Sequence, residues 1–140
     1  MSVLLDTNVL SETRRPKPDP RVIEWLDRLD EDRAFISVVT LAEIRRGVAL
    51  MQRGRRRDAL SIWLARDLID RFARRILLVD EKTTFAWGDL MAEAKRRGLG
   101  LASMDGLIAA TAIASGLTLV TRNVQDFRGL AVELPDPWTA

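Results

Sequence analysis

The chain has 140 residues, a length that fits one domain with a hydrophobic core of its own. It contains no cysteine and no histidine, which excludes disulfides, thiolate nucleophiles, imidazole bases and most zinc sites. The formal net charge is only +2, and the pI of about 9.6 is high because few groups titrate between the carboxylates and lysine. Any catalysis must therefore use carboxylates, hydroxyls, Lys, Arg or the backbone, with Mg²⁺ or Mn²⁺ as suitable metals.

The chain shows no internal repeat and no linker, so we expect a single domain over residues 1–140. No basic residues precede the first apolar stretch, and a secretory signal is not expected. The longest run without charge, residues 106–121, has 16 residues and is interrupted by Gly116. A membrane span needs about 18. We therefore expect a cytoplasmic protein with no membrane partner.

The apolar pattern predicts strands that alternate with helices. Strands are expected at 2–6, 34–38, 76–79 and 117–121, with a weaker candidate at 130–134. Five helices are expected. The first begins at Asp19-Pro20, the second covers 38–51, and the third carries Leu60, Leu64, Leu68 and Phe72 at four-residue spacing. The fourth runs from Asp80 to about Arg97, and the fifth covers the apolar segment 106–115. This alternation predicts an α/β fold with a parallel sheet, in which ligands bind beyond the carboxyl ends of the strands.

Three of the 20 carboxylates stand in apolar surroundings: Asp6 after VLL, Glu43 inside TLAEI, and Asp105 in SMDGLIAATA. Each has a purely structural explanation. Asp6 suits an Asx-turn, Glu43 forms a capping-box pattern with Thr40, and Asp105 suits the N-cap of the helix behind it. These explanations weaken when the three are considered together, because all three acids fall on the same predicted edge of the sheet.

Clustered carboxylates repel one another, and a divalent cation would balance their charge. Mg²⁺ binds a few carboxylates, keeps several waters and also binds phosphate oxygens, so a metal-activated water could attack a phosphodiester. Basic clusters at 53–57, 74–75 and 95–97 are either contacts for a polyanion or ordinary solvated ends of helices.

LLDTNVLSE, TLAEIRRG, MDGLIAATA and TRNVQDF, in this order and spacing, resemble the PIN-domain ribonucleases. The likeness is greatest to the toxins of type II VapBC toxin–antitoxin pairs, in the FitB-like branch, whose C-terminal tail the final DPW (136–138) resembles. The resemblance spans essentially the whole chain. It implies a single PIN domain, a Rossmann-like α/β/α sandwich with a mostly parallel central sheet, and Mg²⁺- or Mn²⁺-dependent cleavage of RNA. It also implies a homodimer and a small VapB-like antitoxin that blocks the site and binds operator DNA, in a heterotetramer or a larger assembly.

In this resemblance, Asp6, Glu43 and Asp105 match the acidic triad of the family, and we expect them to be catalytic residues and metal ligands. The fourth position is Asn123, where some members carry Asp. Asp126 is an alternative holder of the second metal, although Asn123 and Asp126 also fit a small capping motif. Thr121 is expected to hydrogen-bond a water held by the metal.

Two other functions stay open at this point. One is an aspartyl-phosphate phosphotransferase with Asp6 as nucleophile, although Thr7 and Asn8 do not fit the loop that this reaction requires. The other is a non-catalytic module that binds RNA or a partner, in which the acids only cap helices.

Overall fold

The computed structural model describes residues 2–130, 132, 134, 135, 137 and 138. Among these residues it contains four strands: β1 (Val3–Leu5), β2 (Ala34–Ser37), β3 (Ile76–Leu77) and β4 (Thr118–Val120). They form one parallel sheet in the order β3-β2-β1-β4. The predicted α/β sandwich with a parallel sheet is therefore confirmed, as are four of the predicted strands. The weaker candidate at 130–134 includes residues 131 and 133, which lie outside the described residues.

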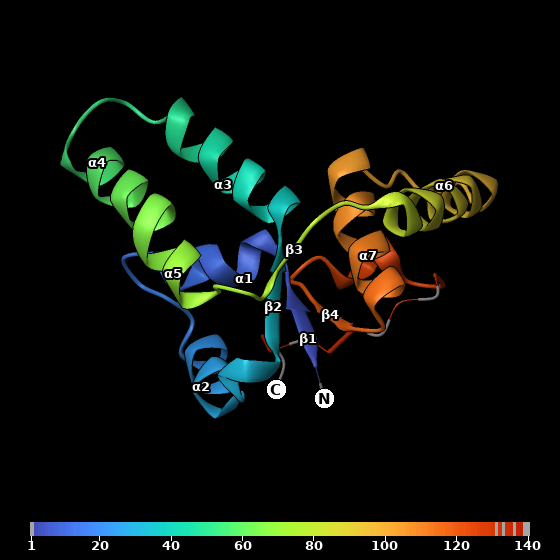
Figure 1. The fold of residues 1–140 in the computed structure, drawn as a ribbon, viewed down its shortest axis with the longest axis horizontal. Helices are drawn as coiled ribbons and strands as arrows, with labels where there is room; N and C mark the ends of the chain where they lie inside the picture. The colour runs from blue at the N-terminus through green and yellow to red at the C-terminus, as the bar shows by residue number, and fades with distance from the viewer. Residues whose placement is uncertain (1, 131, 133, 136, 139–140) are drawn as a thin grey trace.

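Helices cover both faces of the sheet (Figure 1). On one side lie α1 (Thr7–Glu12), α2 (Pro20–Arg28), α3 (Val38–Leu50), α4 (Arg55–Ile62) and α5 (Ile69–Arg71). On the other side lie α6 (Glu81–Arg96) and α7 (Ser103–Ser115), and Gly116 ends α7 in the left-handed conformation with φ +66°. In the part of the chain that the structure describes, no helix combines the length and the apolar character that a bilayer span requires.

The strands are apolar throughout because both faces of the sheet are buried. Successive side chains of a strand point to opposite faces. Val3 and Leu5 thus join the core beneath α1 and α3, whereas Leu4 joins the core beneath α6 and α7, and all three are at most 2% exposed. Each such buried side chain contributes on the order of 2 kcal/mol to stability.

The segment that follows α4 differs from a regular helix. Residues Trp63–Leu68 form a π-helical stretch between α4 and α5. Leucines at strict four-residue spacing drift around an α-helix, which has 3.6 residues per turn. The wider turn of a π-helix compensates for this drift. It brings Leu64, Leu68 and Phe72 into the same core.

The hydroxyl of Thr40, in the first turn of α3, is buried and has no hydrogen-bond partner among the described residues. An unpaired buried hydroxyl costs about 1–3 kcal/mol. We expect Thr40→Val, which keeps the shape of the side chain, to raise the free energy of unfolding by about 1 kcal/mol in urea denaturation.

Thr83→Val is the matched control, because the equally buried Thr83 hydroxyl donates to Asp80 Oδ1 at 2.8 Å and its loss should lower stability. If Thr40→Val were less stable than the wild type, the Thr40 hydroxyl of the wild type would have a partner such as a buried water.

Candidate active site

Asp6 occupies the junction where β1 passes directly into α1. Its Oδ1 accepts a hydrogen bond from the Thr7 backbone N–H at 2.7 Å, so Asp6 caps α1, close to the turn-forming role considered from the sequence. Its Oδ2 accepts a hydrogen bond from the Thr121 hydroxyl at 2.7 Å. The parallel register pairs Leu5 with Val120 and therefore sets Asp6 beside Thr121. This second bond belongs to no local turn, because it joins residues 115 positions apart.

Asp6 is a buried residue, only 2% exposed. Burial raises its pKa from 3.8 to about 6, although the hydrogen bonds from Thr121 and Thr7 act in the opposite direction. The negative charges of Asp105 and Glu43 raise the pKa of Asp6 further. The folded chain therefore holds a carboxylate whose charge is poorly stabilised by its own surroundings.

Glu43 reaches the same end of the sheet from the second turn of α3. The cap of α3 is Ser37, whose Oγ accepts a hydrogen bond from the Val39 backbone N–H at 3.0 Å. The capping box between Thr40 and Glu43 is therefore wrong, because the helix begins earlier than that pattern requires. Glu43 Oε1 instead accepts a hydrogen bond from the Thr7 hydroxyl at 2.7 Å, which ties Glu43 to the residue next to Asp6.

Asp105 lies in the first turn of α7, which begins at Ser103 rather than at 106. The N-cap is Ala102, so the capping explanation for Asp105 is also wrong. Burial raises the pKa of Asp105, and the charges of Glu43 and Asp126 raise it further. All three acids therefore lie within reach of one another's charge.

The first turn of α7 is held in place by α6. Trp87 Nε1 donates a hydrogen bond to the Ser103 carbonyl at 3.2 Å. Gly106 allows the close approach of the two helices, because a Cβ at this position would collide with Met91. These contacts position Asp105 at the edge of the sheet.

Asn8 joins the site to the end of β4. Its Nδ2 donates to Thr121 Oγ1 at 3.2 Å and lies 3.4 Å from Asp6 Oδ2, and its Oδ1 accepts the Arg122 backbone N–H at 3.0 Å. The sequence reading assigned no site role to Asn8 or to Thr7. Their only sequence signal is that they directly follow Asp6.

Asn123 is exposed, and its backbone N–H donates to Thr121 Oγ1 at 3.1 Å. It precedes a 3₁₀ turn, Val124–Phe127, but its side chain makes no capping bond to that turn, so the capping motif with Asp126 is wrong. Thr121 donates its hydroxyl to Asp6 and thereby orients the carboxylate.

The acids share one end of the sheet without closing into a tight cluster. Among the described residues, no group of three or more carboxylates is arranged closely enough to hold a metal ion together. Nor does any described Lys or Arg form an ion pair with Asp6, Glu43 or Asp105.

The fold and the site define an α/β/α protein with uncompensated acids at the carboxyl edge of its parallel sheet. A sequence model described as the PIN domain matches residues 3–132, and the chain belongs to this family.

Three curated relatives match nearly the whole chain. Toxin FitB of Neisseria gonorrhoeae is 40% identical over 136 residues, covering 97% of this chain and 98% of the relative. Plasmid stability protein StbB of Pseudomonas syringae pv. tomato is 38% identical over 138 residues, covering 99% of each. VapC ribonuclease Y4jK of Sinorhizobium fredii is 36% identical over 136 residues, covering 97% of each.

Two solved structures share the fold over nearly the same extent. The crystal structure of FitAcB from Neisseria gonorrhoeae gives a TM-score of 0.93 at 40% identity and 99% coverage of both chains. The structure of FitAB bound to an IR36 DNA fragment gives 0.91 at 39% identity, covering 97% of this chain and 95% of that one.

The raised pKa of Asp6 predicts a pH-dependent loss of stability in the presence of a chelator. Well below pH 3.8 the carboxyl is protonated in both the folded and the unfolded state, and between pH 3.8 and about 6 the folded state binds the proton more tightly. Stability should therefore fall as the pH rises through this window, by about 3 kcal/mol. The Asn side chain of Asp6→Asn does not ionise, so this variant should not lose stability in this way. The unfolding free energy of the variant minus that of the wild type should therefore rise between pH 4 and pH 7.

Urea denaturation at several pH values measures this difference. Asp80→Asn is the control, because a hydrogen bond from the Thr83 backbone N–H lowers the pKa of Asp80. For this variant, the unfolding free energy minus that of the wild type should stay level or fall over the same pH window. If the unfolding free energy of Asp6→Asn minus that of the wild type does not change with pH, burial does not disfavour the Asp6 charge.

Proposed function

We propose that this chain is a metal-dependent endoribonuclease toxin that a small VapB-like antitoxin holds inactive. The observation that carries the proposal is the buried Asp6 carboxylate, which shares the end of the sheet with Glu43 and Asp105 and has no cationic partner among the described residues. Relatives named as a toxin and as a VapC ribonuclease, each at least 36% identical over nearly the whole chain, support this activity.

The residues of the site suit a hard divalent cation such as Mg²⁺ or Mn²⁺. Asp6, Glu43 and Asp105 would hold it, and its positive charge would stabilise the carboxylates of Asp6 and Asp105, whose pKa values are raised by burial and further by neighbouring acids. Mg²⁺ commonly uses one or two carboxylates and keeps several waters, so a tight cluster of three acids is not required. When bound, the cation would supply an activated water and offset the charge that develops on the phosphodiester during in-line displacement.

The other side chains of the site act as positioning residues. Thr121 and Asn8 orient Asp6 from the end of β4 and from α1, and Thr7 orients Glu43. Asn123 offers an exposed amide oxygen in the fourth position without adding a charge to the repulsion. We propose that these residues preorganise the acids for their ligand, since groups held in place before the reaction need no costly reorientation.

A groove beside the acids suits the antitoxin. A cavity of about 390 Å³ begins at Thr7 and Glu43 and continues along α3. Its apolar wall includes Ile44, Val48 and Trp63. An apolar helix fits such a groove, and a basic side chain at its end could pair with the acids. The FitAB complex bound to a DNA fragment supports the further proposal that operator DNA is bound through the antitoxin.

The remaining parts of the proposal are a cytoplasmic homodimer of single PIN domains over residues 1–140, joined to the antitoxin as a heterotetramer or a larger assembly. The two competing functions are less well supported. Both oxygens of Asp6 already accept hydrogen bonds, which disfavours its use as a phosphoryl acceptor. A module whose acids only cap helices is disfavoured because neither Glu43 nor Asp105 caps a helix.

Purified protein should cleave total RNA in the presence of Mg²⁺ and stop when a chelator is added. Asp105→Asn should lower the rate of cleavage by about 100-fold or more, because it removes charge at the reacting centre. Asp89→Asn on the exposed face of α6 is the matched control and should cleave as the wild type does. Gel analysis of a labelled RNA gives the rates. Cleavage that persists in Asp105→Asn, or that is absent from the wild type, would contradict the proposed function.

A second set of variants tests the fourth position. Asn123→Asp should increase the stabilisation of the protein by Mg²⁺, because Mg²⁺ prefers carboxylate oxygen to an amide. The same change should lower the melting temperature in a chelator through added repulsion. Asp126→Asn should retain most of the cleavage activity. If Asp126→Asn instead lost as much cleavage as Asp105→Asn while remaining folded, Asp126 rather than Asn123 would occupy the fourth position.

A further inference from the structure

A second cavity, of about 500 Å³, lies between the loop that joins α1 to α2 and the end of β4. Charged side chains dominate its lining. The cations are Arg15, Lys17, Arg21 and Arg122, and the carboxylates are Glu12 and Asp19. Asp6, Glu43 and Asp105 are not among the residues that line this cavity.

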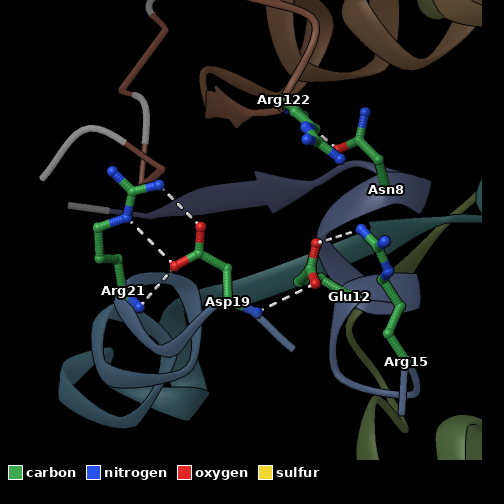
Figure 2. A network of polar contacts seen from close by, with 6 residues as sticks. All are labelled: Asn8, Glu12, Arg15, Asp19, Arg21 and Arg122. Carbon is green, nitrogen blue, oxygen red and sulfur yellow. Dashed lines mark hydrogen bonds and ion pairs between the residues drawn. The ribbon is translucent and has the colours of Figure 1, made fainter. Parts of the chain in front are cut away.

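Internal bonds engage the two carboxylates of this cavity (Figure 2). Glu12, only 3% exposed, accepts the Asp19 backbone N–H at 3.2 Å and pairs with Arg15 at 3.3 Å. Asp19 pairs with Arg21 at 2.8 Å. Within the described part of the chain, no ion pair engages the exposed side chains of Lys17 and Arg122. The cavity therefore retains positive charge that its own acids do not neutralise.

Arg122 connects this cavity with the acidic site. It directly follows Thr121, and its backbone N–H donates to Asn8 Oδ1 (Figure 2). The side chain of Asn8 also contacts Asp6. Its guanidinium lies over the ring of Trp138, 5.5 Å from the centroid. Trp138 is only 8% exposed, so the ring supports one face of the guanidinium and leaves its donors available to a ligand.

Arg15 lines both this cavity and the groove beside Glu43. Basic side chains thus line both the groove that contains Glu43 and the cavity that shares Arg15 with it. The acids alone would repel a polyanion, and cations on either side of them are needed to hold one. Arginine is well suited to this task because it binds phosphate through two parallel hydrogen bonds.

We propose that the cavity lined by Lys17 and Arg122 binds a backbone phosphate of the RNA adjacent to the phosphodiester that is cleaved. Arg122 and Lys17 make the principal contacts, whereas Glu12 and Trp138 are positioning residues. The inference rests on the proposed function, because it describes how the same site holds its substrate.

Binding of a fluorescein-labelled, random-sequence RNA 12-mer, measured by anisotropy in a chelator at several salt concentrations, tests the proposal without cleavage. Arg122→Gln and Lys17→Gln should each weaken binding and reduce the slope of log K against log salt by about 0.7, the value for one lost contact to single-stranded nucleic acid. Arg122→Lys should restore most of the slope. With Mg²⁺, Arg122→Gln should raise KM and leave kcat nearly unchanged.

Arg66→Gln and Lys95→Gln are matched controls, because both residues are exposed and line neither cavity, and their slopes should equal that of the wild type. Unchanged RNA binding by Arg122→Gln and Lys17→Gln, with wild-type cleavage intact, would overturn the subsite and leave the proposed function standing. If Arg122→Gln and Lys17→Gln weakened binding of the antitoxin but not of RNA, the cavity would bind a protein ligand and the RNA subsite would be overturned. RNA binding that depends on Arg122, without any cleavage by the wild type, would support the subsite and overturn the proposed nuclease activity.

Discussion

The site depends on one constraint: a carboxylate is buried at the carboxyl end of the central strand. A buried charge is costly unless it is hydrogen-bonded. Asp6 meets this requirement by accepting hydrogen bonds from the backbone N–H of Thr7, its neighbour in sequence, and from the hydroxyl of Thr121. The parallel register of β1 and β4 places Thr121 beside Asp6. The order β3-β2-β1-β4 places β1 between two partners, so the junction is enclosed on both sides. The compensation is incomplete, as the raised pKa of Asp6 indicates.

Under the proposed function, this incomplete compensation connects the stability of the chain with its ligand binding. Acids that repel one another lower the stability of the free protein and favour any ligand that brings positive charge. A divalent cation and a basic side chain of an antitoxin would compete for the same carboxylates. Their positioning residues, Thr7 and Asn8, sit on the helix that Asp6 itself caps. The helix cap and the buried charge of Asp6 therefore belong to one strand-to-helix junction.

The sequence predicted the features that depend on local chemistry. The apolar strands, the helix that begins after Asp19 and the left-handed stop at Gly116 follow from composition and short spacing. The span of α3 was predicted, but the capping box between Thr40 and Glu43 was wrong, because Ser37, the last residue of a strand, caps the helix. The start of α7 was predicted too late, because this helix begins before its apolar run. The contacts of Thr7 and Asn8 could not be predicted. They depend on side chains 36 and 113 positions away, which only the folded sheet brings together.

The pairing of β1 with β4 has a consequence for biosynthesis. The first strand leaves the ribosome long before residues 118–121 are made, and contacts so distant in sequence form late in folding. Until β4 adds to the sheet, Asp6 lacks its bond from Thr121 and stays hydrated, with an ordinary acidity. A nascent or prematurely terminated chain consequently has no assembled acidic site. The topology itself thus delays the appearance of the site until residues 118–121 have been made.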